Sequence, residues 1–348
     1  MSTLLSALRT RVVSSGAVDG KNLVAFSGGV DSSLVAALVH QIFPDNSLAC
    51  VGVSAALPAA QLHLARSVAR HIGIPLTEVS TSEGSDPHYV ANKGQSCFHC
   101  KTHLYSALEA VAAQAGVESR RDICDDRPQG TVGGGDVEGH GGAGRGGGGG
   151  KRRVVLFNGT NKDDKRDTTR VGLKAAADFQ VASPIDLLTK AEVRAVSREL
   201  GLPNWSHAAS PCLRSRLAFG VEATPERLAL IEKAEDVARK ILGLGVSHNL
   251  RVRAMHGNKA LLEVDAGEVL EQALRMLPDI RSLILPLGFG DLDVRAFRSG
   301  AVSGGSAIAE EQGSMGTLAG VVETGGGVDV YRVGGTGVHS EVARKPLQ

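Results

Sequence analysis

A serine- and glycine-rich loop near the start of the chain has the residues needed to bind phosphate. It reads Phe26-Ser27-Gly28-Gly29-Val30-Asp31-Ser32 and lies between an apolar run and a segment with helical periodicity. Consecutive glycines let the backbone approach an anion closely, and the amides of a helix N-terminus attract negative charge. The hydroxyls of Ser27 and Ser32 add donors, and the carboxylate of Asp31 can hold Mg²⁺ against the same phosphates. We therefore expect a nucleotide-phosphate site here rather than a plain strand-to-helix turn.

The cysteines are a second set of residues that could do chemistry. Cys97 and Cys100 form a C-x-x-C pair, a spacing that lets two thiolates face one metal but also occurs in redox and cluster sites. The total is five, an odd number, and we expect no secretory signal because Arg9 and Arg11 interrupt the first apolar stretch, so a disulfide framework is disfavoured. Cys50 lies in a predicted buried strand and is expected in the core, and Cys124 is given no role. The pattern indicates reduced thiols used for a metal, a cluster or catalysis.

Two later segments extend the candidate site. Asn158-Gly159-Thr160-Asn161-Lys162-Asp163-Asp164 follows a predicted strand and offers amides and carboxylates where a bound nucleotide would lie. Ser210-Pro211-Cys212-Leu213-Arg214-Ser215-Arg216 adds a third thiol, more than a hundred residues after the C-x-x-C pair. We expect the fold to bring these segments to one place.

The elements that must position these residues alternate between strands and helices. Apolar runs at 23–26, 49–53, 76–79 and 154–157 are predicted strands, and the segments 33–39, 58–72 and 102–115 are predicted helices. This alternation predicts an α/β fold with a parallel sheet. A helix at 224–242, with Thr224 as its cap and Pro225 at its first position, opens a smaller α+β module. That module continues with paired strands at 250–255 and 260–264 and a helix at 267–277.

The domain organisation follows from these elements and from two glycine-rich segments. We expect a nucleotide-binding domain at 1–223, an α+β domain at 224–300 and a disordered tail at 301–348. The segment 118–151 is predicted to be a disordered insert, because it is dominated by glycine and lacks the apolar periodicity that could repay its ordering entropy.

Composition limits the possible partners and location. Lys and Arg number 38 against 37 Asp and Glu, so no basic excess points to a nucleic-acid partner. No run approaches the ~20 apolar residues that span a membrane. We expect a cytoplasmic protein. Arg9 and Arg11, with no acid before Asp19, leave an organellar transit peptide as a weaker alternative to a first helix with Leu4, Leu5, Leu8 and Val12 on one face.

The loop resembles that of the PP-loop ATP pyrophosphatases, which lack the Gly-Lys-[Ser/Thr] end of Walker-type loops. Within that superfamily the chain resembles the LarE-type pyridinium-3,5-biscarboxylic acid mononucleotide sulfurtransferases from about residue 23 to residue 300, apart from the insert. The resemblance rests on the loop at 27–32, Cys97-x-x-Cys100-Lys101, Gly159-Thr160-Asn161, Asp163-Asp164, Ser183-Pro184, Cys212-Leu213-x-Ser215-Arg216, Arg251-Val252-Arg253 and Phe297-Arg298-Ser299-Gly300. The chain departs from the pattern at Val171, where the family usually has proline, and at Arg214, which replaces a small residue.

The resemblance implies an ATP-dependent enzyme that adenylates a carboxylate of a nickel-pincer cofactor precursor and then inserts sulfur. Some members sacrifice the cysteine that matches Cys212 and become dehydroalanine-bearing, whereas others hold a [4Fe-4S] cluster on three cysteines. Because this chain has Cys97, Cys100 and Cys212, it resembles the cluster-bearing members. Family members can also form homo-oligomers. The residues expected to bind ATP are Ser27, Gly28, Gly29, Asp31, Ser32, Ser54, Gly159 and Thr160, with Asp31 on Mg²⁺.

The implied substrate is a small nucleotide that carries phosphate and carboxylates, so arginines are expected around it. Ser215, Arg216, Arg251 and Arg253 are the candidates, with Arg214 beside them, because guanidinium groups bind such anions in bidentate fashion. Three alternatives share the loop. They are a tRNA-thiolating enzyme, which the neutral charge disfavours, an ammonia-using ligase, which gives the cysteines no purpose, and a nucleotide-binding module without catalysis.

Overall fold

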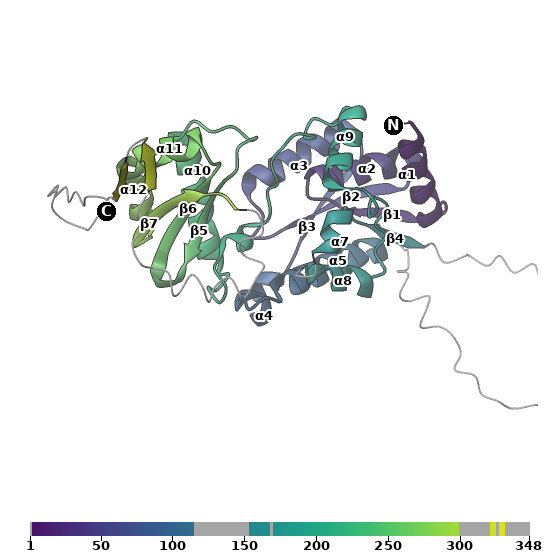
Figure 1. Ribbon diagram of the computed structural model, residues 1–348. Helices are drawn as coiled ribbons and strands as arrows, with labels where there is room; N and C mark the ends of the chain where they lie inside the picture. Colours follow the sequence, from purple (N-terminus) through teal and green to yellow (C-terminus); the bar gives the residue numbers. More distant parts are fainter. Residues whose placement is uncertain (1, 115–152, 168–169, 299–320, 325–326, 331–348) are drawn as a thin grey trace, which may run out of the picture. The chain divides into compact units, whose positions relative to one another are not determined.

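The computed structural model describes residues 2–114, 153–167, 170–298, 321–324 and 327–330 (Figure 1). The chain divides into one unit at residues 1–303 and another at residues 304–348, and each is described by itself. The insert predicted at 118–151 lies outside the described residues, as does most of the tail predicted at 301–348. In the second unit, β8 (Val321–Thr324) and β9 (Gly327–Val330) pair as an antiparallel hairpin.

The first sheet has four parallel strands in the order β3-β2-β1-β4, as the alternating pattern predicts. Its strands are β1 (Lys21–Ala25), β2 (Ser47–Val53), β3 (Leu76–Ser80) and β4 (Val154–Phe157). The helix that opens the chain, α1 (Ser2–Ser15), buries Leu8 and Val12 against it, so the face expected for a first helix is confirmed.

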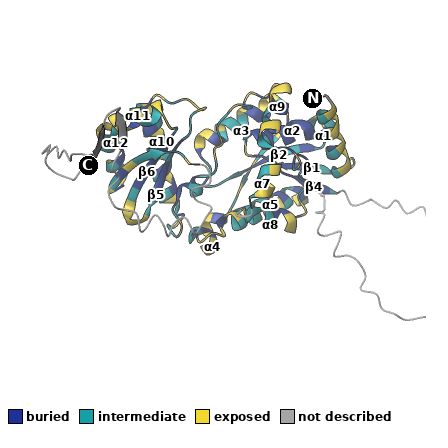
Figure 2. Ribbon diagram, in the orientation of Figure 1, coloured by how far each residue is buried: buried dark blue, intermediate teal, exposed yellow. Residues whose placement is uncertain are grey.

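Alternate residues of these strands enter two separate cores. Val24 faces a core built from α1, α2 (Val30–Ile42), α3 (Ala59–Ile72) and α9 (Lys190–Glu199). Its neighbours Leu23 and Ala25 face the other side, where α5 (Ser96–Gln114) and α8 (Gly172–Asp178) pack. Because helices cover both faces, β1, β2 and β4 are mostly apolar and buried, and Figure 2 shows them largely in the colour of buried residues. The edge strand β3 has no buried residue.

The strand order fixes where a ligand can bind. The chain runs outward from β1 through β2 to β3 and then crosses back to β4 on the other side of β1. In open α/β sheets ligands bind beyond the carboxyl ends of the strands where the order reverses, which here lies between β1 and β4. The loop at 27–32 follows β1 and the segment at 158–161 follows β4, so both reach this point.

A three-stranded sheet forms the later part of the first unit. β5 (Leu250–Met255) and β6 (Lys259–Val264) are antiparallel as expected, and β7 (Asp291–Ala296) lies parallel to β6. The long helix α10 (Pro225–Ile241) is capped by Thr224, as the sequence predicts, and contributes Leu228 to the core beneath the sheet. Both sheets belong to the same unit, so the domain boundary expected at 223/224 stays a prediction.

Two expected helices have different bounds in the structure. The helix predicted at 102–115 begins at Ser96, which places the C-x-x-C pair inside its first turns. The helix predicted at 267–277 is α11 (Glu268–Arg275), followed by α12 (Leu277–Ile284), whose start is marked by Pro278. None of the helices described is long and apolar enough to cross a membrane.

Candidate active site

The loop between β1 and α2 has the conformation that its glycines predict. Gly28 has a φ of +69°, and a Cβ there would stand 2.6 Å from the Cα of Ala65, so only glycine fits. Gly29 is the N-cap of α2 and gives no side-chain cap to the first amides of the helix. The hydroxyl of Ser32 donates to the Gly29 carbonyl at 3.1 Å and lies 3.1 Å from the hydroxyl of Ser27. This is an open anion-binding helix start with two hydroxyls beside it.

Gly159, after β4, touches the same loop from the other side. A Cβ on this residue would lie 2.7 Å from the amide nitrogen of Ser32, a distance that Cβ atoms do not adopt. Next to it, the amide of Thr160 donates to the side chain of Asn158 at 3.0 Å. The structure thus brings the two sequence-predicted phosphate segments into direct contact.

We expect Gly159→Ala to weaken ATP binding about tenfold, because the added methyl group must push away the backbone that carries Asp31 and Ser32. Overpacking of this kind costs about 1–3 kcal/mol, and 1.4 kcal/mol is a factor of ten in affinity. Titration of ATP by calorimetry measures the change. Gly245→Ala is the matched control, because nothing lies within 4 Å of its added Cβ. Equal losses in the two variants would contradict the assignment.

Asp31 is held between two side chains of later segments. Its carboxylate forms an ion pair with Lys190, at the start of α9, and accepts a hydrogen bond from Asn161 at 3.1 Å. Asn161 is in turn fixed by a reciprocal cap with Asp164 at the start of α7 (Lys162–Arg166). The backbone of Lys190 donates to Asp163 at 2.8 Å. Asp31 is therefore a preoriented carboxylate at the mouth of the phosphate loop.

Ser54 follows β2 and faces the neighbouring strand end. Its hydroxyl donates to Glu83 at 2.6 Å and accepts a hydrogen bond from the amide of Ala56. Glu83, in the short helix η1 (Glu83–Ser85), is buried, and its second carboxylate oxygen has no hydrogen-bond partner among the described residues. The structure places Ser54 at the carboxyl edge of the sheet, one strand away from the phosphate loop.

The three candidate cysteines gather around one arginine. Cys97 is exposed and its sulfur accepts a hydrogen bond from the Nη2 of Arg214 at 2.7 Å. The pKa of Arg214 is raised by Cys97, Cys212, Tyr89 and Cys100 against the opposing effect of burial. Burial, with Cys212 and Glu83 adding to it, raises the pKa of Cys100 to about 12. The three thiols are thus close enough to influence the same groups.

A hydrogen bond joins the segment 210–216, here called the Cys212 loop, to the chain that follows β2 of the first sheet. Cys212 is the N-cap of the short helix η2 (Leu213–Arg216), and the amide of Leu213 donates to the Ala56 carbonyl at 2.8 Å. Ala56 lies just beyond the carboxyl end of β2, the strand that adjoins β1. The chain therefore holds Cys212 at the edge of the sheet where the phosphate loop lies.

We expect the thiols to react with iodoacetamide at very different rates at pH 8. Burial raises the pKa of Cys50 and of Cys100 to about 12, so about one thiol in 10,000 is a thiolate at that pH. Cys97 is exposed beside a guanidinium and should be alkylated first. Peptide mass spectrometry after timed quenching measures the order. Alkylation of Cys100 before Cys97 would contradict this arrangement.

The predicted arginines surround the Cys212 loop, but two of them already have carboxylate partners. Arg216 pairs with Glu235 at 2.9 Å and donates to the Cys212 carbonyl at 3.0 Å. Arg253 pairs with the fully buried Glu263 at 2.7 Å and donates to the Ser215 carbonyl at 2.9 Å. Both arginines therefore shape the loop that carries Cys212.

Arg251 is the one of the predicted arginines Arg216, Arg251 and Arg253 that has no carboxylate partner among the described ion pairs. Its guanidinium lies 4.5 Å from the centre of the Phe297 ring and donates to the Ala209 carbonyl. Burial, together with the charges of Arg216 and Arg253, lowers its pKa to about 10. A bound anion would relieve this repulsion. Ser215, the fourth predicted residue, donates its hydroxyl to the Cys212 carbonyl at 2.7 Å.

Comparison with known proteins agrees with this geometry. The model of the asparagine synthase family matches residues 3–91, the part that contains the phosphate loop. The chain is 33% identical over 221 residues to the uncharacterized protein slr1717 of Synechocystis, which covers 63% of this chain and 69% of that protein. The chain belongs to the PP-loop ATP pyrophosphatase superfamily. Its members are ATP-dependent adenylating enzymes.

Two other relatives lie within the superfamily. The pyridinium-3,5-bisthiocarboxylic acid mononucleotide synthase of Lactiplantibacillus plantarum is 28% identical over 285 residues, 80% of this chain and 88% of that protein. The glutamine-hydrolyzing GMP synthase of Mycolicibacterium paratuberculosis is 30% identical over 233 residues, 64% of this chain. The chain spans only 40% of that GMP synthase.

The residues of this PP-loop protein fit ATP and Mg²⁺. The glycine cradle and the preoriented Asp31 suit a metal-bound triphosphate. Among the residues described, no three His, Cys, Asp or Glu side chains are arranged to hold a metal ion. Arg214 contacts Cys97 directly. The cluster expected on Cys97, Cys100 and Cys212 stays a prediction.

Sequence reasoning missed two residues of the site. One is Lys190, the first residue of α9. A local signal was available for it, because Thr189 and Glu192 form the capping box with which that helix begins. Asn204, fully buried, donates to the Gly28 carbonyl at 2.7 Å and to the Ser33 hydroxyl at 2.9 Å. No local signal could have found that contact, since 176 residues separate Asn204 from Gly28.

Proposed function

We propose that the chain is an ATP-dependent sulfurtransferase that adenylates a carboxylate of a pyridinium mononucleotide and replaces an oxygen of that carboxylate by sulfur. The observation that carries the proposal is the attachment of the Cys212 loop to the carboxyl edge of the sheet through Leu213 and Ala56. A nucleophilic thiol beside a PP-loop suits attack on an acyl adenylate. The relative from L. plantarum, whose name describes a bisthiocarboxylic acid mononucleotide synthase, supports the same substrate class.

The first step is adenylation. The amides of Gly28 and Gly29, with the hydroxyls of Ser27 and Ser32, bind the pyrophosphate end of ATP, and Gly159 and Thr160 close the site from β4. A carboxylate oxygen of the acceptor attacks the α-phosphorus, the bond to pyrophosphate breaks, and an acyl adenylate forms. Mg²⁺ on Asp31 would neutralise charge on the departing pyrophosphate.

We place Lys190 in this step as well. In the structure its ammonium neutralises Asp31. If Asp31 held Mg²⁺, the ammonium of Lys190 would be free to face the phosphates, and its positive charge would stabilise the leaving group.

The second step is sulfur transfer from Cys212. Its sulfur attacks the acyl carbon, and AMP leaves with the bridging oxygen, which gives a thioester. Loss of the Cys212 α-proton and cleavage of its Cβ–Sγ bond then release a thiocarboxylate and leave dehydroalanine. Arg251 lies beside this loop with no carboxylate partner among the described ion pairs, and it is the residue that we assign to the acceptor's anionic groups.

A [4Fe-4S] cluster on Cys97, Cys100 and Cys212 is the other sulfur source that the sequence suggests. The contact between Arg214 and Cys97 favours the thiol of Cys212 instead. Iron and acid-labile sulfide analysis after anaerobic purification separates the two. The Cys212 route expects neither element in stoichiometric amount, whereas about four of each per chain would favour the cluster.

An ammonia-using ligase is the second candidate function, because the GMP synthases are similar to this chain. The test supplies ATP, Mg²⁺ and pyridinium-3,5-biscarboxylic acid mononucleotide, with or without ammonium. The sulfurtransferase releases pyrophosphate and forms a thiocarboxylate in both reactions. Product that forms only with ammonium and contains an amide would favour the ligase.

A further inference from the structure

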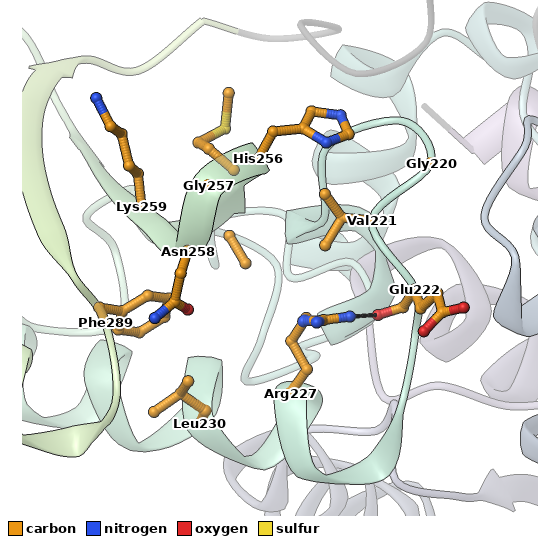
Figure 3. A pocket seen from close by; sticks show the side chains of 12 residues that line it. Gly220, Val221, Glu222, Arg227, Leu230, His256, Gly257, Asn258, Lys259 and Phe289 are labelled. Atoms are coloured by element: carbon orange, nitrogen blue, oxygen red, sulfur yellow. Dashed lines mark hydrogen bonds between the residues drawn. The ribbon is translucent and has the colours of Figure 1, made fainter.

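A cavity of about 270 Å³ lies where the loop at 220–222 meets the turn between β5 and β6 (Figure 3). Arg227 and Leu230 of α10 form part of its wall, and Phe289 completes it. None of the residues assigned above to ATP, to the acceptor or to sulfur transfer lines this cavity. Its occupant would therefore be a separate ligand.

The walls of this cavity differ in character. Leu230 and Phe289 form an apolar side, and Figure 3 shows His256 and Lys259 on the opposite side. Arg227 lies on α10 with Leu230 (Figure 3), fixed by a 2.6 Å hydrogen bond from its Nη1 to the backbone carbonyl of Glu222. Within the described part of the chain, its other guanidinium N–H groups have no hydrogen-bond partner. The wall thus offers donors that still lack an acceptor.

The charge of the cavity favours an anion. Arg227 and Lys259 carry positive charge, and Glu222 is the one acidic residue in the lining. The carboxylate of Glu222 forms no ion pair with Arg227 among the described residues, because its backbone oxygen makes the contact instead. A guanidinium with free N–H groups binds a carboxylate in bidentate fashion.

We propose that this cavity binds a small aromatic carboxylate, with its ring against Leu230 and Phe289 and its carboxylate on Arg227. Pockets for drug-sized ligands have volumes of about 300–1,000 Å³, so this smaller cavity of about 270 Å³ suits a single ring with a polar substituent. The inference does not depend on the sulfurtransferase proposal, because the two sites share no lining residue.

The cavity wall is also bonded to the cysteine site. The amide of Gly220 donates to the Asn92 carbonyl at 3.0 Å, and the Asn92 side chain donates to the Val221 carbonyl at 3.1 Å. The same side chain accepts a hydrogen bond from Arg214 at 3.0 Å. A ligand in the cavity therefore contacts a loop that Asn92 joins to the guanidinium beside Cys97.

Calorimetric titration of the full chain with benzoate tests the proposal, with benzamide as the neutral probe of the same shape. We expect saturable benzoate binding with a Kd of about 1 mM or lower and at least tenfold weaker binding of benzamide. Arg227→Ala should weaken benzoate binding at least tenfold. Arg227→Gln, which keeps a donor for the Glu222 carbonyl, should do the same if the alanine variant fails to fold.

Arg239→Ala is the matched control, because Arg239 lies on the same helix and also donates to a single backbone carbonyl, that of Gly245. Its benzoate affinity should equal that of the unmodified chain. Absence of saturable benzoate binding would overturn the proposal. Equal affinity for benzoate and benzamide, or an Arg227→Gln variant that binds as tightly as the control, would overturn it as well.

Discussion

Asp31→Ala is expected to lower ATP-dependent pyrophosphate release at least about 100-fold while the protein stays folded. The carboxylate stands at the mouth of the phosphate loop, held by Lys190 and Asn161, and Lys190 makes no other ion pair among those described. Its loss removes the ligand expected for Mg²⁺. Because the Asp31–Lys190 pair is partly exposed, breaking it should cost no more than about 1 kcal/mol of folding stability.

A coupled assay of pyrophosphate measures this change, with urea unfolding as the check on stability. Glu78→Ala is the matched control, because Glu78 is an ion-paired carboxylate of β3 whose partner is the surface residue Arg66. The control should keep full activity. Normal pyrophosphate release by a folded Asp31→Ala protein would exclude the assigned role.

Cys212→Ser should abolish thiocarboxylate formation while it leaves adenylation intact. The hydroxyl of serine preserves the size of the side chain but provides no sulfur. The phosphate loop is a separate segment from the Cys212 loop, which the hydrogen bond from Leu213 to Ala56 joins to the edge of the sheet. The exchange of labelled pyrophosphate into ATP, measured with the acceptor present, should therefore continue. Intact-protein mass spectrometry of the unmodified chain should show the loss of one H2S per turnover.

The other cysteines provide the comparison for this prediction. Cys50→Ala alters a buried core thiol and should leave both steps unchanged. Cys97→Ser and Cys100→Ser should retain at least one round of sulfur transfer if Cys212 is the donor. Loss of sulfur transfer in the Cys97, Cys100 and Cys212 variants alike, together with loss of bound iron, would favour the cluster instead.

The phosphate site could be predicted from sequence because its signals are local. A strand, two glycines and a helix start occupy consecutive residues, and the structure places Gly28 and Gly29 as that pattern requires. The parallel sheet could be predicted for a related reason, since strands buried on both faces are short apolar runs. The second sheet was only partly predicted. β7 alternates Leu292 and Val294 with charged residues, a strand signal that the prediction overlooked.

The roles of the arginines could not be predicted from their spacing. Arg251 and Arg253 are two residues apart on β5, and the sequence treats them alike. The structure gives Arg253 a buried partner, Glu263, from β6, and leaves Arg251 over the Phe297 ring. Such pairings depend on strand register, which local patterns do not encode. The contact between Arg214 and Cys97 joins residues 117 positions apart, so it could not be predicted from local sequence patterns either.

The central claim is that a carboxylate of the acceptor is activated as an acyl adenylate. A sulfur nucleophile then attacks the acyl carbon, and AMP leaves with one of the carboxylate oxygens. This claim is tested most directly with a pyridinium-3,5-biscarboxylic acid mononucleotide whose carboxylates carry heavy oxygen. After reaction with ATP and Mg²⁺, mass spectrometry should find one heavy oxygen in AMP and one sulfur atom in the acceptor. AMP without heavy oxygen, or ATP cleaved to ADP and phosphate, would contradict the account.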